Sequence, residues 1–337
     1  METNLKKIMQ ISRRKVLNDI GALATLSLPC GSLFAQGTEY PNKPVKIVVP
    51  WPASGATDVV GRLLAHFLAE NLKGSFYVEN KPGATGLIGT QSVISSPPDG
   101  YTLLAMAPSL HAFYASAAAK IPFHPVNDLT PISAFVNISS VLVVSSESKY
   151  KDVKDVIEDA RKRPGQVMFG SYGNGSSAHM LPELLALRTN TKLTHVPYKG
   201  AAPALTDLLA GRIDFMVDSI STPLPYIKSN RLRALAVLNE SGSPHLPGVP
   251  TLSETVPGMT MVHKIGLGAP PGLPSAIANK LLAAIKAIAK DSSYAEKLFA
   301  LGLEPAYSNS TAEYKEYMGD QLKKWKGVAA KANILMD

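Results

Sequence analysis

Cysteine is nearly absent from this sequence, since Cys30 is the only one in 337 residues. It lies in an N-terminal segment that we expect to be removed, so the mature chain would contain no disulfide, no thiol nucleophile and no cysteine metal ligand. The seven histidines show neither His-x-x-x-His nor His-x-His spacing. The glycine-rich stretch 81–89 lacks both the opening and the ending of nucleotide-binding loops. The sequence therefore predicts no metal and no organic cofactor.

Long apolar runs and concentrated charge are lacking as well. After the N-terminal segment, no stretch approaches the roughly 18 consecutive apolar residues of a membrane-spanning helix, so we expect a soluble mature chain. The formal charge is +8, but five of the 34 basic and only two of the 26 acidic residues fall within the first 35 positions. The other basic residues are scattered and are not interleaved with aromatics, which argues against a nucleic-acid partner.

The N-terminus has the three-part order of an export signal. Positive residues at 6, 7 and 13–15 precede the mostly apolar stretch 20–29, and Ala35 ends a short run that suits cleavage. We expect residues 1–36 to be a signal peptide and the mature protein to be periplasmic. Arg13 and Arg14 resemble a twin-arginine signal, whereas an ordinary secretory signal explains the same residues, so both routes stay open.

Strand-like and helix-like segments alternate along the rest of the chain. Val45–Val49, Phe76–Val78, Val167–Phe169 and Thr194–Val196 are short apolar or β-branched segments, each followed by a turn and a helical pattern. This alternation predicts an α/β fold with parallel-rich sheets flanked by helices. The length of the chain suits about two domains, and similar units in both favour a hinged pair of lobes with a cleft between them.

Two segments are suited to connect the lobes. Ala134–Ser145 is apolar, β-branched and long enough to run from one sheet into another, and glycines and prolines interrupt the chain between Leu238 and Gly266. With two crossings, lobe 1 is discontinuous and consists of residues 37–138 and 255–337, while lobe 2 is 139–254. The segments 275–290 and 311–331 have amphipathic helical patterns and are expected to pack on lobe 1.

Two loops that follow strands contain small and hydroxyl-bearing residues. Ligands of open α/β sheets lie beyond the carboxyl ends of strands, where free N–H groups and the helix dipole favour an anion. Such turns also occur simply to reverse the chain, but one in each lobe favours a ligand site. The candidate ligand-binding residues in these loops are Trp51, Ser54, Gly55, Ala56, Thr57 and Asp58, and Ser171, Gly173, Ser176, Ser177 and His179.

Some of these candidates have a second, structural interpretation. Trp51 either lines the mouth of the cleft or is partly buried, and Thr57 or Asp58 is in a position to cap the helix that follows. Asp218 can accept a hydrogen bond from a ligand ammonium or hydroxyl group, or cap a helix near residue 221. Tyr198 can close over a ligand or pack the hinge. Ser109 completes the candidate set.

A hydrolase or isomerase on an α/β scaffold is the alternative function. Only the serine-rich loop beside His179 favours it, and Gly175–Ala178 lacks the closing glycine of a nucleophile elbow. Ser176 or Ser177 would point away from His179, because residues two or three apart at the start of a helix do not face each other. We therefore expect a binding protein and not an enzyme.

Five segments, in order, resemble the Bug family of extracytoplasmic receptors, the tripartite tricarboxylate receptors. They are 40–58, 79–86, 98–104, 195–200 and 248–254, and they include Pro98-Asp-Gly-Tyr-Thr-Leu-Leu104 and His195-Val-Pro-Tyr-Lys-Gly200. The resemblance covers nearly the whole mature chain. It implies a two-lobe periplasmic-binding-protein fold of the type II kind, which binds small carboxylates, sometimes through water, with the loops 51–58 and 171–179.

The first loop departs from the family pattern. The family usually has Pro-Phe-Pro-Pro-Gly-Gly there, whereas Trp51, Ala53 and Ser54 stand in this sequence, so the identity of the ligand does not carry over. The partners that the resemblance implies are a small carboxylate and either the membrane subunits of a tripartite tricarboxylate transporter or a sensor. We expect the protein to be a monomer.

Overall fold

The structure is a computed structural model that describes residues 40–53, 56–83, 86–108 and 121–334. The expected signal peptide and the candidates Ser54, Gly55 and Ser109 lie outside the described residues. Residues Lys43–Asp337 form one compact unit. Within the described ranges, no helix is both long and apolar enough to cross a bilayer.

The first group of strands is parallel and has the expected strand–loop–helix order. β1 (Val45–Val49) lies between β2 (Phe76–Asn80) and β3 (Thr102–Met106). The β-branched residues of β1 are buried, because α2 (Ala56–Leu72) and α3 (Leu87–Ile94) pack against it. We call this group, with its helices, the first lobe.

The second group repeats the same arrangement. β5 (Met168–Ser171) pairs in parallel with β6 (Thr194–Pro197) and with β7 (Phe215–Ser219). We call this group the second lobe. Its helices are α5 (Val153–Lys162), α6 (Ser177–Thr189), α7 (Ala201–Leu209) and α8 (Leu224–Lys228).

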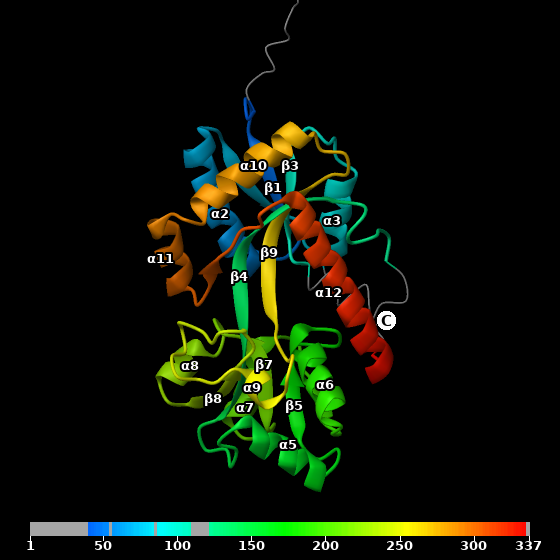
Figure 1. Cartoon of the computed structure of the whole chain (residues 1–337), viewed down its shortest axis with the longest axis vertical. Helices are drawn as coiled ribbons and strands as arrows, with labels where there is room; N and C mark the ends of the chain where they lie inside the picture. Colours follow the sequence, from blue (N-terminus) through cyan, green and yellow to red (C-terminus); the bar gives the residue numbers. More distant parts are fainter. Residues whose placement is uncertain (1–39, 54–55, 84–85, 109–120, 335–337) are drawn as a thin grey trace, which may run out of the picture. The chain divides into compact units, whose positions relative to one another are not determined.

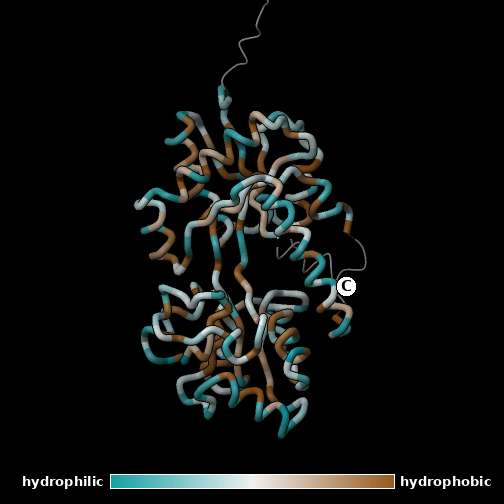
Figure 2. The backbone as a smooth tube through the Cα atoms, in the orientation of Figure 1, coloured by the Kyte–Doolittle hydropathy of each residue, from teal (hydrophilic) through white to brown (hydrophobic). Residues whose placement is uncertain are grey.

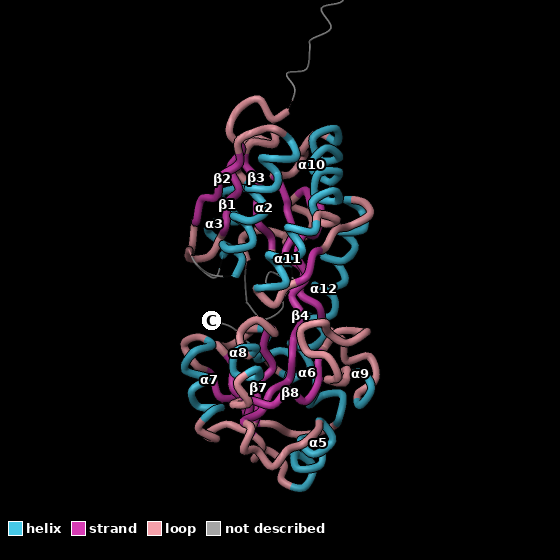
Figure 3. The backbone as a smooth tube through the Cα atoms, turned by 90° about the vertical axis from the view of Figure 1, so that its left-hand side faces the viewer, coloured by secondary structure: helices cyan, strands magenta, loops and turns pink. Residues whose placement is uncertain are grey.

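Two long antiparallel strands join the lobes. β4 (Thr130–Ser145) pairs with β9 (Val262–Ala269) up to Ser139, and from Ser140 onward it pairs with β7 and with β8 (Leu232–Val237). Figures 1 and 3 show β4 running from the strands of the first lobe into those of the second. The resulting strand order is β2-β1-β3-β9-β4-β7-β5-β6.

The C-terminal part returns to the first lobe, as expected, but also contacts the second. α10 (Ser275–Ile288) contacts α2, β4 and α12 (Thr311–Ala332), while α12 contacts β4 and also α6 of the second lobe. Trp325 of α12 is fully buried. The remaining short elements are α9 (Leu252–Thr255), α11 (Ser292–Ala300) and β10 (Glu304–Pro305).

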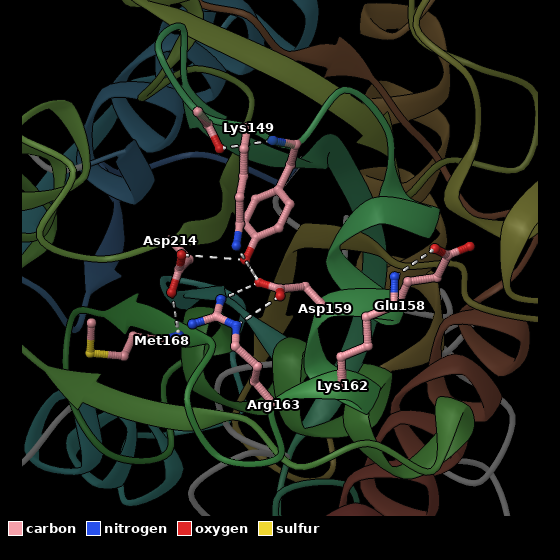
Figure 4. A network of polar contacts seen from close by, with 9 residues as sticks. Lys149, Glu158, Asp159, Lys162, Arg163, Met168 and Asp214 are labelled. Atoms are coloured by element: carbon pink, nitrogen blue, oxygen red, sulfur yellow. Dashed lines mark hydrogen bonds and ion pairs between the residues drawn. The ribbon is translucent and has the colours of Figure 1, made fainter.

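The core of the second lobe is closed at one end by a polar network (Figure 4). Asp159 of α5 accepts hydrogen bonds from Tyr150 (2.6 Å) and Arg163 and forms an ion pair with Lys149 (2.8 Å). Asp214 accepts from the backbone N–H of Met168, at 2.8 Å, and thereby ties the start of β7 to β5. The apolar residues of this lobe lie mainly along its strands and the inner sides of its helices (Figure 2).

The glycine-rich stretch 81–89 leads into α3, which starts at Leu87 with Gly86 as its N-cap in a left-handed backbone conformation (φ 97°). Gly89 lies directly against the chain at the end of β1, where a Cβ atom would come within 2.7 Å of Pro50. The lobe boundaries at 138/139 and 254/255 stay a prediction.

Candidate functional site

Five of the candidate residues come together where β5 ends and α6 begins. The parallel pairing of β5 with β7 brings the carboxyl ends of these two strands side by side, with Gly170 opposite Met216. The connecting loop turns through Gly173 (φ 124°) and Gly175 (φ 71°), a backbone conformation that L side chains rarely adopt. The loop therefore depends on its glycines.

Ser171 holds the loop from inside. Its side chain is fully buried, and its Oγ accepts a hydrogen bond from the N–H of Gly173 at 3.1 Å. The same Oγ lies 2.6 Å from Nε2 of His195, which comes from the neighbouring strand β6. The sequence contains no signal for this contact, because His195 lies 24 residues beyond Ser171 on another strand.

His179 supports the loop from α6. Its Nδ1 accepts a hydrogen bond from the N–H of Gly175 at 3.1 Å, so the ring must be unprotonated at that nitrogen. The rings of His179 and His195 stack with centroids 3.8 Å apart, and Phe169 stacks on His195 at 5.1 Å. Burial lowers the pKa of each imidazole to about 4, and for His195 the neighbouring His179 adds to the effect. Both rings are therefore neutral near neutral pH.

The N-terminus of α6 is buried and has no side-chain cap. Ser176 occupies the N-cap position, but its Oγ donates to the carbonyl of Gly173 (2.7 Å) and accepts nothing from the first turn. Ser177 uses its hydroxyl in a hydrogen bond with Tyr172. The first N–H groups of a helix have no intrahelical partner, so this buried end suits an anion.

Asp218 lies at the end of β7, paired with Val141 of β4. It is 5% exposed, and its Oδ1 accepts from the N–H of Ser219 at 2.7 Å. Within the described residues, its Oδ2 has no hydrogen-bond partner. Burial raises the pKa of Asp218 to about 7. The expected capping role is wrong, because α8 starts only at Leu224, with Pro223 as its N-cap.

Tyr198 is half-buried and packs within the second lobe. Its hydroxyl donates to Asp207 of α7 at 2.7 Å, and its ring lies beside Gly170, where a Cβ atom would be 3.4 Å from it. Burial, followed by the bond to Asp207, raises the pKa of Tyr198 to about 12.

The first-lobe loop is held by Asp58 and Asn80. α2 begins at Ala56, so Thr57 and Asp58 lie inside the helix and are not its N-cap, contrary to the capping prediction. Asp58 is buried, forms an ion pair with Arg62 at 3.0 Å and accepts from Nδ2 of Asn80 at 2.8 Å. These contacts tie its carboxylate to the scaffold.

Trp51 is half-buried beside the same loop. Its backbone carbonyl accepts from Asn80 at 3.2 Å, and its indole lies about 3.3 Å from where a Cβ atom on Gly86 would be. Ala56 is exposed. No separate sequence pattern marks Asn80 or Arg62, because their contact joins side chains 18 residues apart. In the described part of the chain, no three His, Asp or Glu side chains gather as a metal site.

Two parallel α/β lobes joined by long crossing strands, with an uncapped helix N-terminus at the end of a strand, define the class of periplasmic solute-binding proteins. Within that class, the chain belongs to the family described as "Tripartite tricarboxylate transporter family receptor", whose model matches residues 60–334. The resemblance to the Bug family is thereby confirmed.

Relatives of known name and structure agree with this assignment. Protein BugT of Bordetella pertussis is 34% identical over 291 residues, which are 86% of this chain and 89% of that protein. A solved R. palustris protein with adipate has a TM-score of 0.76 and 32% identity, covering 88% of this chain and 99% of its own. MatC of Rhodopseudomonas palustris with bound malate has a TM-score of 0.72 and 26% identity, covering 86% of this chain and 99% of its own.

The family and the fold confirm the expected two-lobe α/β architecture and the expected function as a solute-binding receptor. They give no support to the alternative of a hydrolase or isomerase.

Proposed function

We propose that this protein captures a small carboxylate between its lobes, with the N-terminus of α6 as the main anion-binding element. The observation that carries the proposal is this buried helix end: Ser176, Ser177 and His179 are each 7% exposed, yet the side chain of the N-cap residue Ser176 does not cap it. A buried helix terminus without a partner is unfavourable, and a ligand carboxylate would satisfy it. The adipate and malate bound to two relatives belong to this chemical class.

No cationic side chain is needed for this mode of binding. No Lys or Arg lies in 51–58 or in 171–179, and the imidazoles beneath the second loop are held neutral by burial. The ligand charge would therefore meet backbone N–H groups and the helix dipole, which select by shape more than by charge. The loop at Trp51, Ser54, Gly55, Ala56 and Thr57, together with Ser109, would close on the ligand from the first lobe.

Asp218 would select among classes of ligand. Its unpartnered Oδ2 is an acceptor for a ligand ammonium or hydroxyl group when ionised, and its pKa of about 7 allows a protonated form that donates to a carboxylate. Malate carries a hydroxyl group and adipate does not. The variant Asp218→Asn should therefore reduce the binding affinity for a hydroxy acid and for a plain diacid to different extents.

Calorimetric titration with adipate, malate and other dicarboxylates and tricarboxylates tests the site. The variant Gly173→Val should abolish binding, because valine is strained at φ 124° and would reshape the loop. Gly272→Val is the matched control, since Gly272 also has positive φ (87°) and open space around it but lies outside both loops. Ser176→Ala removes only the bond to Gly173 and should cost about 1 kcal/mol, or roughly fivefold in affinity. Equal affinity in Gly173→Val and Gly272→Val would place the ligand elsewhere.

Catalysis is not part of the proposed function. Ser171 and His195 are paired as a nucleophile and base would be, but the side chain of Ser171 is fully buried and already bonded to the loop. A substrate cannot reach it without unfolding the loop. Ligand-induced thermal stabilisation with no change in the ligand after incubation would agree with a receptor, and turnover would contradict it.

Export and partners complete the proposal. The signal of residues 1–36 would deliver the mature chain, as a monomer, to the periplasm, where it would present its ligand to the membrane subunits of a tripartite tricarboxylate transporter or to a sensor. Replacement of Arg13 and Arg14 by lysine should block export by the twin-arginine route and leave secretory export intact. Fractionation of cells producing each form measures the difference.

A further inference from the structure

A polar pocket separate from the loops 51–58 and 171–179 lies along the strands that cross between the lobes. It has a volume of about 450 Å³ and is lined by β4, β9, the segment after β8, β10 and α12. None of the candidate ligand-binding residues lines it. The size is within the range of small-molecule sites.

Two amide oxygens on this pocket are buried and unsatisfied. Asn239 is 7% exposed, and neither its Oδ1 nor that of Asn137 has a hydrogen-bond partner within the described residues. Glu304 pairs in register with Asn137, and its carboxylate accepts a weak hydrogen bond from Ser139 at 3.4 Å. A buried polar atom without a partner is rare in folded proteins, so the two amide oxygens indicate a missing donor, and the Glu304 carboxylate beside Asn137 is a further acceptor on the same pocket.

Two ammonium groups lie on the same pocket. Lys264, opposite Asn137 in the β4–β9 pairing, has its Nζ 4.9 Å from the ring centre of Tyr317. Lys324 of α12 donates to the carbonyl of Thr260 at 3.0 Å. Among the described residues, neither ammonium group forms an ion pair with a carboxylate. The two lysines and the two glutamates on the pocket, Glu240 and Glu304, balance in charge.

We propose that this pocket binds a free amino acid as its zwitterion. The ligand carboxylate would lie between Lys264 and Lys324, and the ammonium group would donate its three hydrogens to Asn137, Asn239 and Glu304. An ammonium group has three donors and no acceptor, which matches the two unsatisfied amide oxygens together with the Glu304 carboxylate. A dicarboxylate of the kind proposed for the loops fits less well, because it would bring a second negative charge toward Glu304 and Glu240.

Calorimetric titration of the mature protein with the proteinogenic amino acids tests this site. At least one should bind, and its amide and its des-amino analogue should bind at least about tenfold more weakly, because each lacks one of the two charges. Lys264→Gln and Asn239→Leu should each lower the binding affinity for the amino acid about tenfold or more. Lys228→Gln, which changes a lysine of α8 outside the pocket, should not.

The variant Gly173→Val separates the two sites. It should lose the carboxylate ligand and bind the amino acid with unchanged affinity. If no amino acid binds the wild-type protein, or if binding survives in Lys264→Gln, or if it is lost in Gly173→Val, the proposal is wrong. Should Asn239→Leu fail to fold, Lys264→Gln decides alone, since Lys264 is only partly buried.

Discussion

The contact between α3 and the end of β1 predicts that replacing the helix residue Gly89 by alanine destabilises the protein. Replacing a glycine by alanine inside a helix usually stabilises a protein, because glycine is the poorer helix former by about 1 kcal/mol. Gly89 lies inside α3, but a Cβ atom there would be 2.6 Å from the carbonyl oxygen of Lys81 and 2.8 Å from Cα of Pro50. Both of these are backbone atoms, so relief requires movement of the chain.

The magnitude follows from two opposing effects. Overpacking of a tight contact costs about 1–3 kcal/mol. The gain in helix propensity offsets up to about 1 kcal/mol of this. Gly89→Ala should therefore lower the free energy of unfolding by up to about 2 kcal/mol, which for a protein of this size lowers Tm by up to about 3 °C.

Calorimetric unfolding of the mature protein measures this change, with Gly327→Ala as the matched control. Gly327 also lies inside a helix, α12, but a Cβ atom there meets nothing within 4 Å, so this variant should be as stable as the wild type or more stable. Because Pro50 and Lys81 flank the first-lobe loop, Gly89→Ala should also weaken carboxylate binding. If both alanine variants are stabilised equally, α3 does not press on β1 and the argument fails.

Two further predictions concern pH. Burial lowers the pKa values of His179, His195 and His263 from 6.5 to about 4. The unfolded chain therefore binds more protons between these pH values, and the free energy of unfolding should fall as the pH drops from about 6.5 to about 4. His179→Asn keeps an acceptor for the N–H of Gly175 but does not titrate, so urea unfolding should show that it loses less free energy of unfolding over this range. The hydrogen bond from Arg163, followed by those from Lys149 and Tyr150, holds the pKa of Asp159 well below its usual value. Asp159→Asn should therefore be less stable than the wild type near pH 7, and the difference in the free energy of unfolding should shrink as the pH falls below about 4. A difference that does not change with pH would mean that the network contributes no charge-dependent stability.

Local pattern was sufficient for much of the fold. The apolar strand Val45–Val49 has the bounds that the sequence predicted, because its β-branched run is followed directly by a proline. The crossing at Ala134–Ser145 was also predicted, since a run of that length and composition is too long for one edge of a small sheet. What local pattern does not contain is the direction of pairing: β4 and β9 are antiparallel to their neighbours, although each lobe is parallel elsewhere.

The candidate site shows the same limit at the level of single residues. From the sequence, Ser176 and Ser177 were considered as hydrogen-bond partners of His179, because they are close to it in the chain. In the structure, His179 instead binds the backbone of Gly175, and the serine that meets a histidine is Ser171, whose partner lies 24 residues further on.

That pairing is a consequence of register. β5 and β6 are aligned so that Phe169 lies opposite His195, and the imidazole then reaches Ser171, two residues along and on the same face of the sheet. A shift of one residue would turn His195 to the other face, leaving Ser171 without its partner and His179 without its stacking ring. The shape of the anion-binding loop is thus determined by strand alignment, which explains why its glycines were visible in the sequence and its supporting histidine was not.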